Sequence, residues 1–94
     1  MSQLNDKLNA WVGTDGIDYT DTEIGIAHCF KWLVPKLNEP VIQFRTHFNN
    51  SKWYAYIKID CSPWESEGYG ETPALALCLA LGKLYSGTKG EEKE

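Results

Sequence analysis

The sequence predicts an α+β fold, a three-stranded antiparallel β-meander packed with helices in the order α-α-β-β-β-α. Two patterns carry this prediction. Apolar residues recur at helical spacing before residue 40 and after residue 72, and they alternate with polar residues from Val41 to Asp60. The chain has 94 residues, 43% of them apolar, which suits one core that folds without a cofactor. We therefore expect a single domain over residues 1–87 and a charged, disordered tail over residues 88–94.

Two helices are expected before the strands. Ser2 is placed to cap the first helix and Gly13 to end it, and the apolar face between them holds Leu4, Leu8, Trp11 and Val12. Thr20 and Glu23 have the spacing of a capping box, which predicts the start of the second helix. The apolar stripe of that helix comprises Ile26, Phe30, Leu33 and Leu37. Pro35 must end or kink it, because proline lacks an amide donor.

The strands follow from alternation with a period of two. Inward positions of the first strand are Ile42, Phe44, Thr46 and Phe48, and outward ones are Gln43, Arg45 and His47. A turn at residues 49–51 leads to a second strand with Trp53, Ala55, Ile57 and Ile59 on one face and Tyr54, Tyr56, Lys58 and Asp60 on the other. Ser62-Pro63 ends it, and residues 64–70 predict a short third strand. The polar positions favour a sheet with one face open to water over a three-layer α/β/α arrangement.

The last helix has the clearest start. Thr72 is a good cap and Pro73 fits the first helical position. Leucines at 75, 77, 79, 81 and 84 make the helix apolar almost all round, so we expect it to be the most buried element. Gly87 is placed to end it.

Composition excludes several classes of protein. The net charge of −4 argues against direct nucleic-acid binding, and no apolar run is long enough to span a membrane or to form a signal peptide, so we expect a cytoplasmic protein. Cys29, Cys61 and Cys78 form no close-spaced pair, which favours buried, reduced thiols. His28 and His47 do not extend the cysteines into a metal-ligand spacing, and adjacent His28 and Cys29 would point ~100° apart on a helix. We expect no metal, no cofactor and no enzyme.

A family resemblance rests on two segments, Asp21-Thr22-Glu23-Ile24 and Gly70-Glu71-Thr72-Pro73-Ala74-Leu75-Ala76-Leu77-Cys78-Leu79-Ala80-Leu81. Through them the chain resembles the bacteriophage ABA sandwich domain family over most of residues 4–85, although it has Thr-Pro-Ala where that family tends to have Thr-Ala-Pro. The resemblance implies a phage-encoded accessory protein with helices on both sheet faces. It implies no activity and no functional residues.

Two further resemblances cover less of the chain. The segment from Tyr54 through Thr72-Pro73 and the helix beyond is similar to HicB-like antitoxins, which implies an antitoxin or regulator. The α-β-β-β-α order looks like double-stranded-RNA-binding domains. Those domains have a lysine cluster where this chain has Glu71, Thr72 and Pro73, so repulsion from phosphate disfavours that function.

The candidate functional residues lie on the polar side of the predicted sheet. They combine aromatic rings with carboxylates, as protein interfaces do, and are Tyr54, Tyr56, Trp64, Glu65, Glu67 and Tyr69. We predict a non-catalytic phage accessory protein that binds a host protein or protein complex there, such as a defence or nucleic-acid-processing complex. One alternative is that the first or second helix covers these rings. Others are a HicB-like antitoxin and a self-associating structural protein that forms a homodimer.

Overall fold

The computed structural model describes residues 3–47, 52–59 and 65–90, of which His47 and residues 85–90 are described by their backbone alone. The elements are α1 (Gln3–Val12), a helical run of α2 (Gly25–His28), the π-helical η1 (Cys29–Leu33) and the 3₁₀ turn η2 (Val34–Lys36), then β1 (Pro40–His47), β2 (Lys52–Ile59), β3 (Glu65–Gly70) and α3 (Pro73–Gly90). The predicted α+β class and element order are confirmed. Pro35 lies in the closing turn of the second helical run, as expected. Outside the described residues are Ser2, Phe48, the turn at 49–51, Asp60, Cys61, Ser62-Pro63, Trp64 and residues 91–94.

The strands form one sheet in the order β1-β2-β3, with antiparallel neighbours. Ala55 lies between Phe44 and Gly68 in the register, and Ala55 and Ile57 are fully buried. Because side chains alternate along a strand, the residues between them face the opposite side of the sheet. The predicted inward and outward sides are therefore confirmed for residues 42–45 and 53–58, whereas Thr46, which was predicted to face inward, is exposed at the end of β1.

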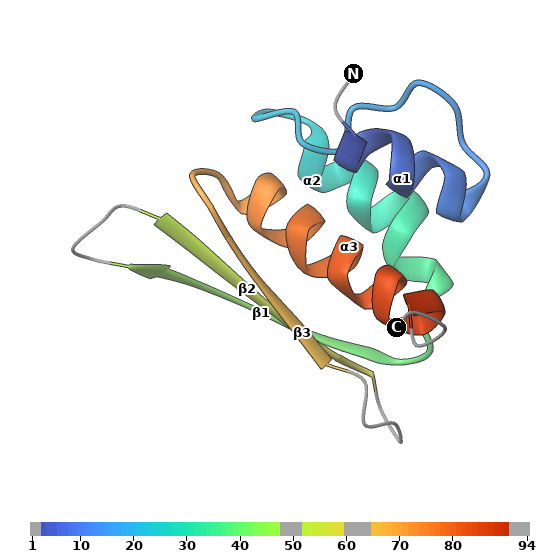
Figure 1. Ribbon diagram of the computed structural model, residues 1–94. Helices are drawn as coiled ribbons and strands as arrows, with labels where there is room; N and C mark the ends of the chain where they lie inside the picture. Colours follow the sequence, from blue (N-terminus) through green and yellow to red (C-terminus); the bar gives the residue numbers. More distant parts are fainter. Residues whose placement is uncertain (1–2, 48–51, 60–64, 91–94) are drawn as a thin grey trace.

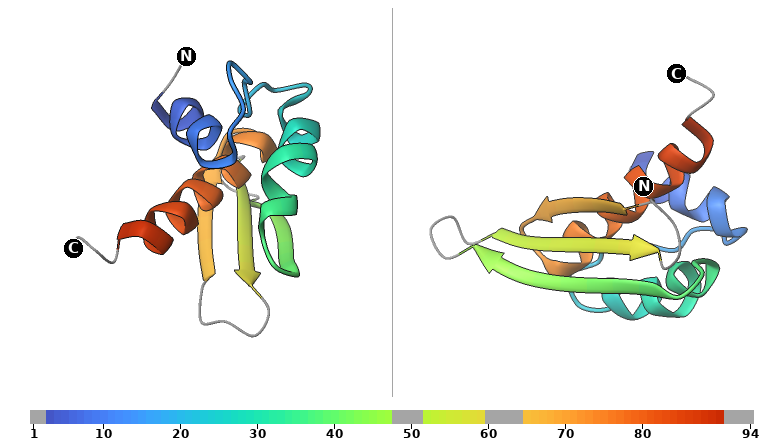
Figure 2. Two further views of the ribbon diagram at one scale, coloured as in Figure 1. Left: turned by 90° about the vertical axis from the view of Figure 1, so that its right-hand side faces the viewer. Right: turned by 90° about the horizontal axis from the view of Figure 1, so that it is seen from below.

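All the described helices lie on one side of the sheet (Figures 1 and 2). Helix α3 packs directly on one face of the sheet. Helix α1 lies on the side of α3 that is turned away from the strands. No described helix covers the opposite face of the sheet. Of the two arrangements that the sequence left open, the sheet with one uncovered face is the one found, since the described helices do not cover both faces as the family resemblance implied.

Helix α3 is buried on two sides because it lies between the sheet and α1, whereas Leu75 and Leu79 are half-buried and Lys83 is exposed. Its fully buried residues are Ala76, Leu77, Cys78, Ala80 and Leu81. Thr72 caps it as predicted, since the Thr72 hydroxyl oxygen accepts the Leu75 N–H at 3.1 Å. The helix does not end at Gly87 but runs to Gly90, so residues 88–90 belong to it and not to a tail. A single glycine in a helix costs only about 1 kcal/mol, which the rest of the helix can offset.

The contact between β3 and α3 depends on small residues. A Cβ atom at Gly68 would overlap the Ala76 carbonyl oxygen and lie 2.7 Å from the Ala80 nitrogen, and one at Gly70 would lie 2.8 Å from the Ala76 nitrogen. Ser66, two positions before Gly68, donates its hydroxyl to the Ala80 carbonyl. Helix and strand backbones therefore touch, and side chains at these strand positions would separate them.

The second helical run begins differently from the prediction. Asp21 Oδ1 accepts the N–H groups of Glu23 at 2.8 Å and Ile24 at 3.0 Å, whereas the Thr20 hydroxyl donates to Asp18 Oδ1 at 2.8 Å. The predicted cap at Thr20 is wrong, because Asp18 engages that hydroxyl. The amide hydrogen bonds from Ile24 and Glu23 hold the pKa of Asp21 below its usual value, since they favour the ionised carboxylate.

The buried side of this run is also shifted from the predicted stripe. Gly25, Cys29 and Leu33 are buried at intervals of four residues, whereas Phe30 is 46% exposed. The prediction that Phe30 faces the core is therefore wrong. Gly25 selects the observed face, because a Cβ there would lie 2.5 Å from the Tyr19 carbonyl oxygen and 3.1 Å from Ala74 Cβ.

Two buried asparagines of α1 hold the loop that leads to α2. Asn5 Oδ1 accepts the Tyr19 N–H at 2.8 Å, and Asn5 Nδ2 donates to Asp18 Oδ1 at 2.8 Å. Asn9 Nδ2 donates to the Ile17 carbonyl at 2.9 Å, and Asn9 Oδ1 accepts the Ile17 N–H at 3.2 Å. The two asparagines are one turn apart on the helix. Their side-chain amides provide the hydrogen bonds that backbone groups of this loop would otherwise need from other backbone groups.

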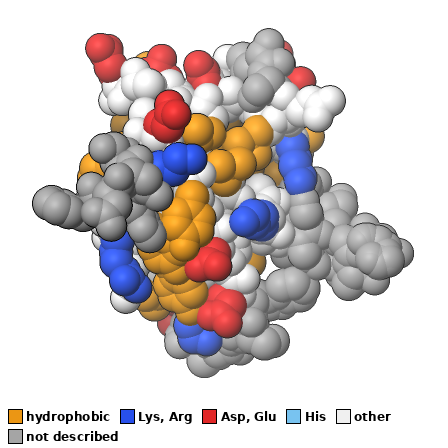
Figure 3. Space-filling view, turned by 60° about the vertical axis from the view of Figure 1, so that its left-hand side comes forward, with side chains coloured by type: hydrophobic (Ala, Val, Ile, Leu, Met, Phe, Trp, Pro, Cys, Tyr) orange, Lys and Arg blue, Asp and Glu red, His pale blue; other side chains and the backbone are white. Residues whose placement is uncertain are grey.

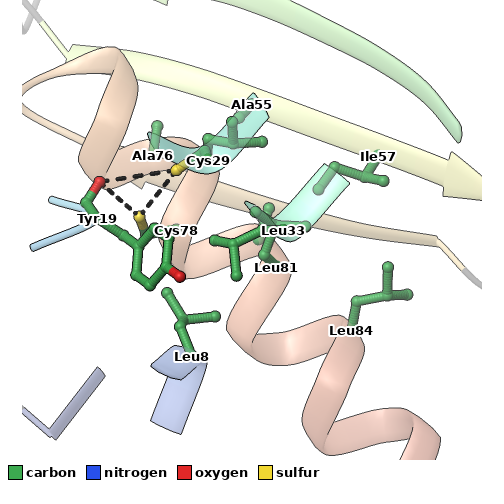
Figure 4. Close-up of a cluster of buried hydrophobic side chains, with 12 residues drawn as sticks. Leu8, Tyr19, Cys29, Leu33, Ala55, Ile57, Ala76, Cys78, Leu81 and Leu84 are labelled. Atoms are coloured by element: carbon green, nitrogen blue, oxygen red, sulfur yellow. Dashed lines mark hydrogen bonds between the residues drawn. The ribbon is translucent and has the colours of Figure 1, made fainter. Parts of the chain in front are cut away.

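The centre of the core joins all three helical segments and the sheet (Figure 4). The thiols of Cys29 and Cys78 lie 3.6 Å apart, and both point at the Tyr19 carbonyl oxygen, at 3.7 Å and 3.1 Å respectively. Both cysteines are free and buried, as predicted, and the contact with Cys29 together with burial raises the pKa of Cys78. Among the described elements, no helix has the length and apolarity needed to cross a lipid bilayer.

Candidate functional site

The uncovered side of the sheet presents ten described side chains, which we call the open sheet face. Val41, Gln43 and Arg45 come from β1, Lys52, Tyr54, Tyr56 and Lys58 from β2, and Glu65, Glu67 and Tyr69 from β3. The register arranges nine of them in three rows across the strands. These rows are Arg45-Tyr54-Tyr69, Gln43-Tyr56-Glu67 and Val41-Lys58-Glu65.

Five of the six predicted site residues meet on this face. Tyr54 and Tyr56 are half-buried, Glu65 and Glu67 are exposed, and Tyr69 is 46% exposed. No described helix reaches them, so the alternative in which the first or second helix covers the rings is wrong. The sixth predicted residue, Trp64, lies outside the described residues.

Two hydrogen bonds join the tyrosines to the carboxylates diagonally across β2 and β3. The Tyr54 hydroxyl donates to Glu67 Oε1 at 2.7 Å, and the Tyr56 hydroxyl donates to Glu65 Oε1 at 2.5 Å. The Glu67 carboxylate raises the pKa of Tyr54 to about 12, because the hydrogen bond holds the hydroxyl proton. Glu65 raises the pKa of Tyr56 for the same reason. Each tyrosine thus stays a neutral donor, and each pair fixes the orientation of its two side chains.

A row of stacked groups runs across one end of the face. The rings of Tyr54 and Tyr69 have centroids 5.0 Å apart at an interplanar angle of 54°. On the other side, the Arg45 guanidinium carbon lies 5.4 Å from the centroid of Tyr54, a cation-π distance. Arg45 was not among the predicted site residues. Its outward position was predicted, and the register with Tyr54 would have added it to the site.

The charges on the open sheet face have both signs and are separated. Arg45 is on β1 and Lys52 and Lys58 are on β2, whereas both carboxylates are on β3. A hollow of about 240 Å³ opens beside the carboxylates and is lined by Tyr56, Glu65, Ser66 and Glu67. Figure 3 views the molecule from the side on which the sheet lies in Figure 1 and shows apolar side chains with acidic and basic groups beside them.

Outside the open sheet face, the described chain also places His28 next to Cys29. His28 and Cys29 do not form a nucleophile–base pair, because the Cys29 thiol points at Tyr19 and Cys78, and the His28 ring packs edge-on to the Tyr19 ring at 6.4 Å. Among the residues that the structure describes, no group of three histidine, cysteine, aspartate or glutamate side chains is placed to hold a metal ion. The open sheet face is thus the best-defined candidate site.

The helical side exposes apolar groups that the sequence analysis did not single out. Ile24 is 53% exposed and Trp32 is 37% exposed, and the Lys31 ammonium lies 5.2 Å from the Trp32 ring centroid. These side chains offer a matched control for substitutions on the open sheet face.

Comparison with known proteins returns no relative. No family of known proteins, no curated protein and no solved structure matches the chain.

Proposed function

We propose that the protein is a non-catalytic accessory protein, phage-encoded as its resemblance suggests, that binds a host protein in the cytoplasm through the open sheet face. The observation that supports this most is an uncovered sheet face on which aromatic rings and carboxylates hold one another in place. A host defence or nucleic-acid-processing complex is the target class we propose.

The composition of the face favours a protein as partner. Tyrosine and arginine are the residues most enriched among those that dominate binding energy at protein interfaces, and here they stack as Arg45, Tyr54 and Tyr69. Glu65 and Glu67 would repel the phosphates of a nucleic acid. The same carboxylates would favour a protein groove that carries basic residues.

Preorganisation adds to this argument. Ordering a flexible side chain on binding costs about 0.5–1.5 kcal/mol. The hydrogen bonds of Tyr54 with Glu67 and of Tyr56 with Glu65 already restrict four side chains of the free protein. A partner that meets this face therefore encounters donors and rings whose positions are set before binding.

The test compares two double variants in a quantitative capture from host lysate. Tyr56→Ala with Glu67→Ala removes one aromatic ring and one carboxylate from the open sheet face. Trp32→Ala with Glu23→Ala removes the same kinds of group from the helical side, where both residues are exposed. We expect a stoichiometric partner to be retained by the wild type and by the helical-side variant and to be lost with the sheet variant.

Circular dichroism of both variants establishes that the fold is kept. A partner that the sheet variant retains as well as the wild type would contradict the proposed surface. A partner lost only with the helical-side variant would move the site to the region of Trp32.

A further inference from the structure

We infer that β1 is a dimerisation edge: two copies of the chain join their β1 strands antiparallel, and their sheets merge into one. The inference rests on the outer edge of the sheet and the apolar groups beside it, and it does not depend on the proposed host partner. Because the strand order is β1-β2-β3, the outer edge of β1 pairs with no strand of the described chain. Backbone N–H and C=O groups on such an edge are a template for another strand.

The edge at β1 lacks the features that usually protect an edge strand. Those features are a short strand, a bulge, a proline within the strand, or charges. β1 has eight residues in uninterrupted register with β2, and Pro40 is only its first residue. The side chains of Ile42 and Phe44 on its inner side are apolar, and Arg45 is its one residue of the Lys, Arg, Asp and Glu types.

The opposite edge, at β3, is protected. That strand has six residues and carries Glu65 and Glu67. In an antiparallel pair of two β3 strands, a two-fold axis at Glu67 sets this residue against itself, and an axis at Ser66 sets Glu65 against Glu67. Like charges directly opposite each other destabilise a strand pair. Self-pairing is therefore favoured at β1 and disfavoured at β3.

A two-fold axis beside Gln43 and normal to the sheet gives β1 a self-complementary register. Most homodimers have such an axis, and here it keeps both open sheet faces on the same side. Gln43 then faces its own counterpart, Ile42 faces Phe44 of the second copy, and Val41 faces Arg45. Apolar side chains meet on the inner side, and the two glutamine amides can hydrogen-bond to each other on the open side. No charge lies directly opposite a charge.

The cations of the open sheet face are compatible with this register. Beyond Val41 of the second copy lies its Lys58, two strand spacings or about 10 Å from Arg45. That separation exceeds the Debye length of about 8 Å at physiological salt. The Arg45 guanidinium also lies against Tyr54 of its own β2, on the side away from the second copy. Lys52 pairs with His47, beyond the residues 40–46 that meet in the dimer.

The helices leave one end of β1 uncovered. The second helical run ends at Lys36 and lies on the β1 side of the sheet, near Pro40 (Figure 2). The other end of the first hairpin extends beyond the helices (Figures 1 and 2). There the rings of Phe44 and Trp53 pack edge-on with centroids 6.5 Å apart, and both side chains are only half-buried.

A second copy covers this end, which a single extended peptide would not do. The proposed register sets Pro40 of the second copy beside Thr46, so the helical run of the second copy lies on the side of the sheet that Phe44 and Trp53 face. Exposed apolar surface is also concentrated around this edge. Of the five large apolar side chains that are exposed in the described chain, four belong to the second helical run or to β1, namely Ile24, Phe30, Trp32 and Val41.

The expected dimer is weak. Interfaces that bury less than about 1,200 Å² are typical of transient complexes, and one strand with a few neighbouring side chains is of that kind. We expect association in the micromolar range. Sedimentation equilibrium of the purified protein from low micromolar to several hundred micromolar should show the mass rising from 10.7 kDa toward twice that value.

Substitutions at Gln43 test the register, because this exposed residue faces its own counterpart. In Gln43→Glu and in Gln43→Lys, each homodimer sets like charges against each other, so each should associate about fivefold or more weakly than the wild type. A mixture of the two variants sets opposite charges together and should associate at least as tightly as the wild type. Gln3→Glu and Gln3→Lys are the matched controls, since Gln3 is exposed on α1, and they should leave association unchanged.

Hydrogen exchange identifies the edge that pairs. As the protein concentration rises, amide exchange should slow in β1 and stay unchanged in β3. The variant with Tyr56→Ala and Glu67→Ala should dimerise as the wild type does, because neither residue is on β1. Failure of the dimer and failure of the proposed host binding are therefore distinguishable.

Four outcomes would overturn the inference. The first is a wild type that stays monomeric at every concentration, including one whose β1 edge pairs with a strand of another protein instead. The second is a dimer that neither charge at Gln43 weakens. The third is a mixture that associates no better than its two components, while thermal unfolding shows that both are folded. The fourth is a dimer that slows exchange in β3 and leaves β1 unprotected.

Discussion

Replacing Gly68 with alanine tests the direct contact between β3 and α3. The added Cβ would overlap the carbonyl oxygen of Ala76 and lie 2.7 Å from the nitrogen of Ala80. Both are backbone atoms of a helix that has the sheet on one side and α1 on the other, so α3 cannot move away without disturbing a second interface. Overpacking of a core typically costs about 1–3 kcal/mol, and a clash with two backbone atoms belongs at the upper end. In a domain of this size, a loss of about 3 kcal/mol lowers the melting temperature by roughly 12–24 °C.

Gly82→Ala is the matched control, because it adds the same methyl group to a buried glycine of α3. There the new Cβ would lie 2.9 Å from Leu4 Cδ1, the end of a flexible side chain that can turn aside. Alanine also favours a helix interior over glycine by about 1 kcal/mol. Thermal and urea unfolding followed by far-UV circular dichroism should show a large loss for Gly68→Ala and little change or a gain for Gly82→Ala. A Gly68→Ala protein that unfolds at the same temperature and urea concentration as the wild type would refute the close approach of strand and helix.

Three other predictions concern the loop, the sheet face and the core. Asn9→Ala should lower the free energy of unfolding in urea by about 1–3 kcal/mol, because it leaves part-buried backbone groups of Ile17 without these hydrogen bonds, whereas Asp6→Ala at an exposed position of the same helix should change it little. The folded-state pKa of Tyr54 is raised from 10.0 to about 12, so its hydrogen bond stabilises the fold fully below pH 10 and this stabilisation is lost as the pH rises through about 12. Ultraviolet titration should therefore show a tyrosine that ionises at high pH, and Glu67→Gln should lower the pKa of that tyrosine. The Cys78 thiol should react with a disulfide reagent only as fast as the protein unfolds, because it is buried and its pKa is raised, and rapid reaction in the native state would contradict the described core.

Much of the fold follows from periodicity. The change from helical spacing to alternation at Val41 separates the helices from the sheet, and the same alternation correctly assigns Tyr54 and Tyr56 to one face and Ala55 and Ile57 to the other. Helix α3 follows from the Thr72 cap and the run of leucines. These features are local, so neighbouring residues suffice to predict them.

The failures have a common cause in contacts between distant segments. Phe30 fits an apolar stripe as well as Cys29 does, and only the approach of Gly25 to Tyr19 and Ala74 selects the buried face. Asn5 and Asn9 look like ordinary polar residues of a surface helix until the loop that they bind is in place. Such choices depend on where other elements lie, which the spacing of one segment does not reveal.

The geometry of the candidate site could be predicted only in part, for the same reason. Alternation in β3 placed Glu65, Glu67 and Tyr69 on one side, but the pairing of each tyrosine with a carboxylate depends on the register between strands. Arg45 belongs to the candidate site because the register between β1 and β2 places it beside Tyr54. The sequence between these two strands does not specify that register.

The central position of α3 also determines when the fold can form. The helix is the last of the described elements, yet it supplies the surface against which α1, the second helical run and the sheet all pack. Its thiol at Cys78 contacts the carbonyl of Tyr19, 59 residues earlier. During synthesis, the earlier elements therefore emerge with their apolar sides exposed and remain so until Pro73–Gly90 has been made. The core of this domain can therefore close only after that helix has been synthesised, and until then the exposed apolar surface is prone to aggregation.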